Sequence, residues 1–189
     1  EAEQLRQMVD AERARLLEAL ERRWLRTLRH EWTHQLVHAF GIHSACGAEH
    51  LWMQEGMAQY CETLPVGGVV PERLALLHEA MGNRELIPWH QLVDSPCREG
   101  FGTRWENVEL AYAQSWFLFY FLMKGQRRSG FMRYIMRVQK LSADPGAGPR
   151  SDLLGWCLKE PFVGVIREAM SFLRSTKIEE VSALEGDLP

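Results

Sequence analysis

The segment His30-Glu31-Trp32-Thr33-His34 forms a His-Glu-x-x-His pattern within a stretch of helical character. On a helix, positions i and i+4 lie on one face, so the imidazoles of His30 and His34 can bind one metal ion together. Glu31 is turned by about 100° from His30 around the helix axis, so its carboxylate can act as a general base without binding the metal. Short patterns of this kind also arise by chance, so the motif alone only suggests a metal site.

A second acidic residue, Glu55, follows His34 by twenty-one positions. A catalytic zinc site uses three protein ligands and keeps a fourth position open for water. Two histidines and a carboxylate from a neighbouring helix supply such a set, and the small residues Gly56 and Ala58 predict that the second helix approaches the first closely. The pattern therefore predicts a zinc site at His30, His34 and Glu55. The alternative is that Glu55 is a surface residue of an ordinary amphipathic helix.

Together these segments resemble the gluzincins, and more closely the bacterial peptidase-MA-like domains, in which HExxH is followed by WxxEGxAxY. The corresponding segments here are HEWTH at 30–34 and WMQEGMAQY at 52–60. The segment AYAQSW at 111–116 is similar to the downstream helix of those domains, and ELIPW at 85–89 is similar to their connector. The resemblance covers about residues 27–121, roughly half of the chain.

The resemblance implies a zinc-dependent hydrolase, a metallopeptidase that cleaves peptide bonds in a peptide or protein substrate. His30, His34 and Glu55 would be the zinc ligands, and Glu31 the general base that takes a proton from zinc-bound water. The oxyanion formed at the scissile carbonyl needs a hydrogen-bond donor besides the metal, and Tyr112 is the candidate. The alternative for Tyr112 is a tyrosine that only packs its helix.

Two features depart from the family pattern. Related sites often place an acid four residues after the glutamate ligand, where it orients a histidine ligand, but this chain has Gln59 there. Such domains also have a sheet ahead of the active-site helix, whereas residues 1–29 have the pattern of a helix. An alternative function therefore stays open: a catalytically inactive helical interaction module in which zinc only braces two helices.

The chain as a whole is predicted to be mainly α-helical and zincin-like, with little or no β-sheet. Apolar residues at helical spacing predict helices at about 1–20, 24–40, 51–62, 71–80, 106–123, 130–141, 151–158 and 161–173. Pro88 predicts that 86–93 is extended or turn-like. We expect a single gluzincin-like domain over 1–189, with an N-terminal helix at 1–22, a metal-site core at 23–125 and C-terminal helices at 126–189.

Composition and charge limit the classes of partner. The 189 residues are 46% hydrophobic and 25% charged with a net charge of −3, which is typical of a globular domain and gives no general attraction to nucleic acid. The longest apolar run, 116–123, is too short to span a membrane. Arg133, Arg137 and Lys140 share one helical face, interpreted as a solvated face; a surface for an acidic partner or nucleic acid is the alternative. The four cysteines lack a Cys-x-x-Cys pair, which argues against a zinc ribbon or a thioredoxin-like motif. Free thiols are favoured over at most two disulfides, because a domain of this size does not need disulfides for stability.

Overall fold

A computed structural model describes residues 1–42, 50–95, 101–103, 105–140 and 149–176. Within these ranges the regular elements are all helical and none is a strand, so the prediction of a mainly α-helical chain is confirmed. The elements in chain order are α1 (Ala2–Ala39), α2 (Leu51–Tyr60), α3 (Pro71–Asn83), α4 (Trp89–Asp94), the 3-10 turn η2 (Phe101–Thr103), α5 (Val108–Met123), α6 (Arg127–Lys140), α7 (Arg150–Leu158) and α8 (Phe162–Ser175).

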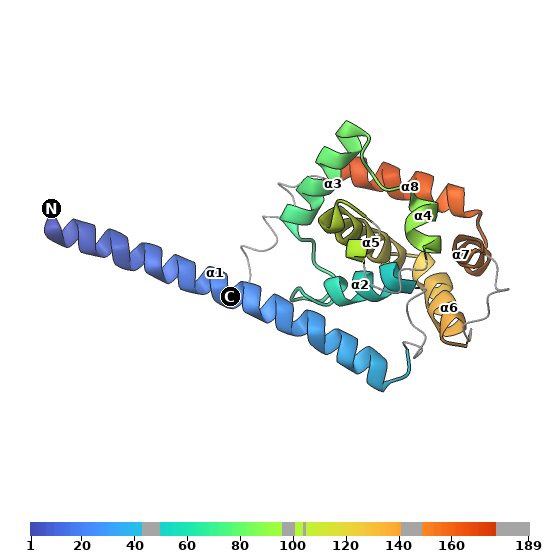
Figure 1. Cartoon of the computed structure of the whole chain (residues 1–189), viewed down its shortest axis with the longest axis horizontal. Coiled ribbons are helices and arrows are strands. Elements are labelled where there is room, and N and C mark those ends of the chain that lie inside the picture. The colour runs from blue at the N-terminus through green and yellow to red at the C-terminus, as the bar shows by residue number, and fades with distance from the viewer. Residues whose placement is uncertain (43–49, 96–100, 104, 141–148, 177–189) are drawn as a thin grey trace.

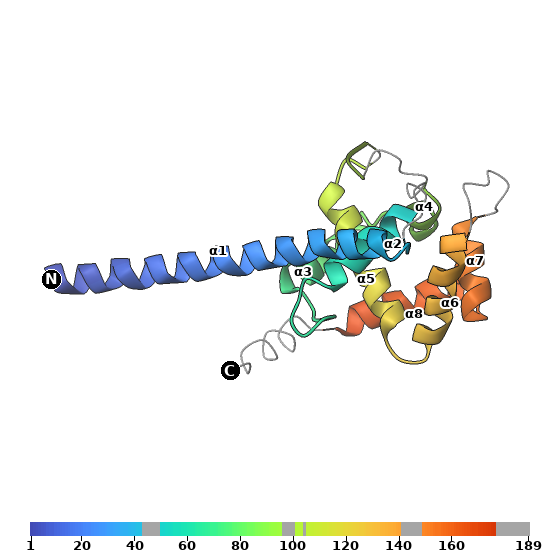
Figure 2. The same cartoon turned by 90° about the horizontal axis from the view of Figure 1, so that it is seen from below.

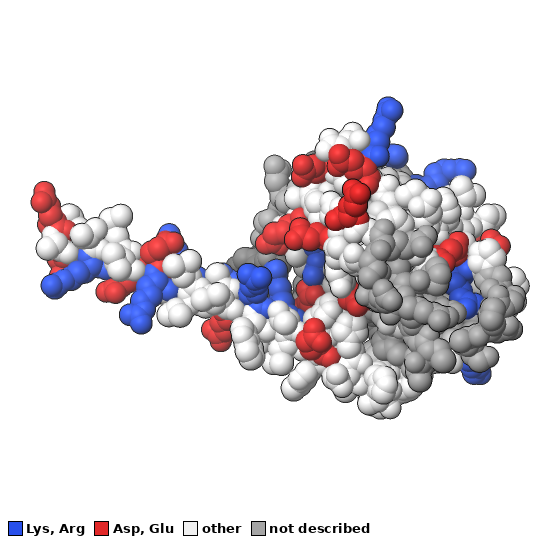
Figure 3. Space-filling view, viewed as in Figure 1, with Lys and Arg blue, Asp and Glu red and all other residues white. Residues whose placement is uncertain are grey.

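The first two predicted helices form the single helix α1, which extends far beyond the remaining helices (Figures 1 and 2). No Gly or Pro separates residues 20 and 24, and the charged residues between them favour helix, so nothing in the backbone interrupts it. The predicted boundary between residues 22 and 23 is therefore not a break in secondary structure. Residues 1–25 are all exposed, and uncharged side chains lie among the charged ones along this part of α1 (Figure 3). The helix ends before Gly41, which takes a φ of +66°.

The central helix of the body is α5. Twelve of its 16 residues are buried. Its sequence is apolar on every face, so its side chains can be buried only if other helices surround it. α2, α3 and α6 all pack against it. A Cβ atom added at Gly56 of α2 would lie 2.6 Å from the carbonyl oxygen of Ser115, so a glycine is needed for this close approach. The expectation that Gly56 allows close approach to the first helix was therefore wrong, since its bare Cα faces α5.

The connector ahead of α4 is held by α5. The side-chain amide of Gln114 is buried, accepts a hydrogen bond from the backbone N–H of Ile87 at 2.8 Å and donates one to its carbonyl at 2.9 Å. The segments at 85–89 and 111–116 are thus in contact. The prediction that 86–93 is extended holds only up to Pro88, which precedes the short helix α4. Proline is well tolerated at a helix start because its missing N–H has no partner there.

The C-terminal helices pack on one another and on the body. Arg133 of α6 donates a hydrogen bond to the carbonyl of Cys157 at 2.8 Å, and the guanidinium of Arg137 lies 4.1 Å from the ring centre of Trp156. Both cations therefore help α6 to pack on α7. Cys61 and Cys157 are free thiols, while Cys46 and Cys97 lie outside the described residues. Among the described helices, none is both long and apolar enough to cross a bilayer.

Candidate metal site

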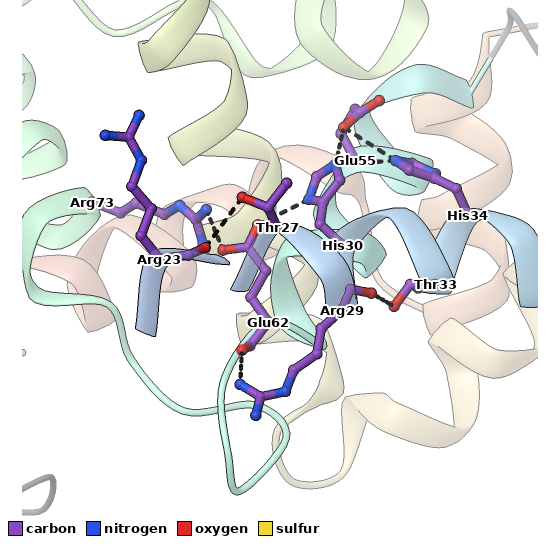
Figure 4. Close-up of polar contacts among 9 residues, drawn as sticks. All are labelled: Arg23, Thr27, Arg29, His30, Thr33, His34, Glu55, Glu62 and Arg73. Carbon is purple, nitrogen blue, oxygen red and sulfur yellow. Dashed lines mark hydrogen bonds and ion pairs between the residues drawn. The ribbon is translucent and has the colours of Figure 1, made fainter. Parts of the chain in front are cut away.

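The three predicted metal ligands come together where α1 crosses α2 (Figure 4). His30 and His34 lie one turn apart on α1, with their Nε2 atoms 3.1 Å from each other. Glu55 comes from the middle of α2, and its Oε2 atom lies 3.3 Å from Nε2 of His30 and 3.6 Å from Nε2 of His34. Two nitrogens and one carboxylate oxygen thus form a small triangle between the two helices.

The triangle has the dimensions of a zinc ligand set. Tetrahedral ligands about 2.1 Å from a zinc ion lie about 3.4 Å from one another, close to the three separations found here. The Oε2 atom of Glu55 is shielded from solvent and, within the described residues, accepts no hydrogen bond of good geometry. The Nε2 atoms of both imidazoles carry lone pairs when they are deprotonated, so the three atoms can present electron pairs to a common point. A cation fits this donor set.

The same convergence shifts the proton affinities of His30 and Glu55. Burial alone would lower the pKa of His30, but contacts with the carboxylates of Glu55 and Glu62 outweigh it and raise the pKa to about 9. Burial alone would raise the pKa of Glu55, but the two histidines outweigh it and lower the pKa to about 2. The site thus favours a positive charge beside an ionised carboxylate.

A further acid, Glu62, contacts the site. No role was predicted for it from the sequence. Its Oε1 atom lies 2.9 Å from Nδ1 of His30, and its Oε2 atom accepts a hydrogen bond from Arg73 at 2.7 Å. Glu62 is 6% exposed, and its backbone carbonyl accepts a hydrogen bond from Arg29 at 3.1 Å. A carboxylate on Nδ1 fixes the orientation of the ring and leaves Nε2 to face Glu55.

The orienting acid therefore stands seven residues after Glu55 instead of four. Gln59, at the family position, is 2% exposed, and its amide atoms have no hydrogen-bond partner within the described part of the chain. Glu62 lies two residues beyond Tyr60, where α2 ends, and the chain there brings its carboxylate to the ring of His30. The spacing of seven residues between Glu55 and Glu62 is visible in the sequence, but the family pattern predicts the orienting acid at position 59.

Tyr112 and Glu31 border the same region. Tyr112 lies on α5, is partly buried, and with His30 lines a cavity of about 400 Å³. Burial raises the pKa of Tyr112, and the negative charges of Glu55 and Glu31 raise it further, which places the phenol within electrostatic reach of both acids. Glu31 itself is exposed on α1, next to His30 and outside the triangle of ligand atoms.

Residues 25–144 match the model of a protein family described as "Protein of unknown function (DUF1570)". The match covers well over half of the chain. The chain belongs to the DUF1570 family. No curated protein and no solved structure matches it. The description of the DUF1570 family names no activity, and His30, His34 and Glu55 all lie inside the matched residues.

Proposed function

We propose that this DUF1570 protein is a zinc-dependent hydrolase, a metallopeptidase of the gluzincin type. The convergence of His30, His34 and Glu55, with separations of 3.1 to 3.6 Å between their donor atoms, supports the proposal most strongly. Two imidazoles and one carboxylate form a common ligand set for catalytic zinc, and three protein ligands leave one position for substrate or water.

The roles of the chain's own residues follow from their chemistry. A bound zinc ion would supply Lewis acidity at the scissile carbonyl. Glu31 then serves as the general base, which takes a proton from the attacking water and delivers it to the leaving amine. Tyr112 donates a hydrogen bond to the developing oxyanion, and its raised pKa keeps the phenol protonated and able to donate at neutral pH. Glu62 is a positioning residue that acts through His30.

The cavity beside His30 and Tyr112 is a reasonable place for part of a peptide substrate. Its volume of about 400 Å³ is enough for a side chain with adjoining backbone. Leu76 supplies an apolar wall, and Gln59 contributes a buried amide with free hydrogen-bonding capacity within the described residues. A peptide bound there would extend past the ligand triangle toward Tyr112.

One observation favours a second candidate, the catalytically inactive zinc-braced module. The described residues include no strand that could hold an extended substrate backbone by its edge. The same ligand triangle would then serve only to join α1 to α2. Glu31 discriminates between the candidates, because a bracing site has no use for a general base.

The test begins with the metal content of the purified protein. We expect about one zinc per chain in the wild type and a large loss in Glu55→Ala. Glu79→Ala is the matched control, because Glu79 is an exposed acid on α3 outside the site. A wild-type protein that binds no zinc, even after zinc is added, would overturn both candidates.

The second stage separates the hydrolase from the module. We expect cleavage within a peptide library by the zinc-loaded wild type, and a loss of about 10²-fold or more in Glu31→Gln with zinc content unchanged. Zinc-loaded protein that cleaves no member of the library, with Glu55→Ala unfolding more easily than the wild type, would favour the module instead.

A further inference from the structure

The protruding part of α1 carries an uncovered apolar stripe. Met8 is 70% exposed but lies to one side of it. Six other large apolar side chains are 57 to 72% exposed and recur mostly at spacings of three, four and seven residues: Leu5, Val9, Leu16, Leu17, Leu20 and Trp24. At about 100° per residue they occupy about a third of the helix circumference. Such spacing is typical of a helix that packs along another helix.

The stripe residues stay more than half exposed in the part of the chain that the structure describes. Further along α1, the face that contacts the body, with His30, His34 and Val37, overlaps one edge of the stripe, since Leu16 and His34 are 18 residues or five turns apart. Leu28, Trp32 and Leu36 are 36, 63 and 54% exposed although they lie beside that contact. These three lie on another side of the helix, so the continuous stripe is confined to the protruding part of α1. A continuous exposed surface of this kind is typical of an interaction site.

The charges along α1 indicate which partner fits this stripe. Residues 1–12 hold four acids and one arginine, while residues 22–29 hold four arginines and no acid. The intervening residues 13–21 hold two acids and two arginines. One end of the protruding helix is therefore negative and the other positive. A second copy laid antiparallel would place each acidic end beside the other copy's basic end, whereas a parallel copy would oppose like charges.

We propose that two copies of this chain associate through an antiparallel pairing of α1. The apolar stripe of each copy covers that of the other about a two-fold axis, as expected for an isologous dimer. The complementary end charges set the antiparallel orientation. The pairing uses the part of α1 before it reaches the body, so it leaves the ligand triangle in each copy intact. This inference does not depend on the proposed zinc chemistry.

The first test is the mass of the protein in solution by light scattering or sedimentation equilibrium. We expect twice the chain mass of 21.9 kDa, and monomers for the variant Leu16→Glu/Leu20→Glu. Gln7→Glu/Ala11→Glu is the matched control, since it adds the same charge on the opposite side of the helix and should leave the dimer intact. Circular dichroism checks that each variant stays helical.

The second test addresses orientation. Either charge reversal alone, Glu3→Lys/Asp10→Lys or Arg22→Glu/Arg23→Glu, should weaken self-association. The quadruple variant that combines them exchanges the two ends, so in an antiparallel pair it should again form dimers with itself but not with the wild type. A quadruple variant that pairs with the wild type would overturn the antiparallel arrangement.

A wild-type chain that stays monomeric up to its solubility limit would overturn the proposal and leave the stripe to a different protein or to a membrane surface. A dimer that survives Leu16→Glu/Leu20→Glu would also overturn it, because the contact would then lie elsewhere on the molecule. Zinc content, measured in parallel, reports separately on the ligand site.

Discussion

The two halves of α1 belong to one uninterrupted helix and differ in nearly everything that surrounds them. From about residue 26 onward, one face of the helix packs on α2 and supplies His30 and His34 to the ligand triangle. Before residue 26, every side chain is exposed. Most helical stability in proteins comes from packing of an apolar face, and isolated helices are marginal in water. The first half therefore has the sequence of a packed helix without a packing partner among the described residues of its own chain.

The family match divides α1 at nearly the same place. It begins at residue 25, close to the point at which the helix first contacts the body. The part of α1 that carries His30 and His34 thus lies inside the match to the DUF1570 family, whereas the protruding part lies outside it. This difference suggests that the two halves serve separate roles, a site in one and association in the other.

The largest expected effect is the difference in stability loss when leucine is replaced by alanine in the buried core and in the protruding half of α1. Leu118→Ala in α5 removes a side chain that is 0% exposed and should lower the free energy of unfolding by about 2–5 kcal/mol. Leu16→Ala, at a position 58% exposed, should change it by less than about 0.5 kcal/mol in dilute, monomeric protein. Urea unfolding measures both. A large cost for Leu16→Ala that persists on dilution would show that the first half of α1 packs within its own chain.

A smaller effect is expected at the contact between α1 and the body. Glu62→Gln keeps a hydrogen-bonding oxygen but loses the charge that binds His30 and Arg73, so zinc affinity should fall by about 10- to 100-fold. Competition with a chelator measures this change. Glu72→Gln is the control. The side chain of Glu72 is 76% exposed, and its ion pair with Arg26 is long, at 3.9 Å. Equal affinity in wild type and Glu62→Gln would remove the positioning role.

The helix starts provide a third comparison. The Asn107 side chain accepts a hydrogen bond from the backbone N–H of Leu110 at 2.9 Å and so caps α5, whereas Glu1 forms no side-chain cap on α1. Asn107→Ala should cost about 1 kcal/mol of stability, and Asn107→Ser, which keeps a capping oxygen, should cost less. Thermal unfolding of the two variants tests this. Equal losses would mean that packing around residue 107, not the cap, is responsible.

The smallest effect is expected for an ion pair within the protruding half. Arg22 contacts Glu18 at 2.7 Å one turn away, with both side chains more than 60% exposed. Pairs of this kind are screened by water and salt, so Arg22→Ala should change the stability of the monomer by no more than about 0.5 kcal/mol. Unfolding in low and high salt measures it. A substantially larger loss in dilute protein would show that α1 depends on its own charge pairs and not on a partner.

Most helices could be predicted from the sequence because the residues that mark their ends act locally. Gly41, Pro71 and Pro161 each lie next to a predicted helix end, and the apolar spacing between them has a helical period. The predictions failed where local signals were weak or ambiguous. No residue between 20 and 24 requires a break in α1, and Pro88 fits an extended segment as well as a helix start.

The sequence by itself determined the ligand candidates, because helical spacing places His30 and His34 on one face and Glu55 stands in a recognisable second segment. Only the tertiary structure decided that Glu62, and not Gln59, contacts Nδ1 of His30, since the crossing of α1 over α2 determines which turn meets the ring. It also decided that Gly56 serves the α2–α5 contact and that the first half of α1 is left uncovered. Residue spacing fixes faces within one helix, whereas contacts between helices depend on packing across the whole chain.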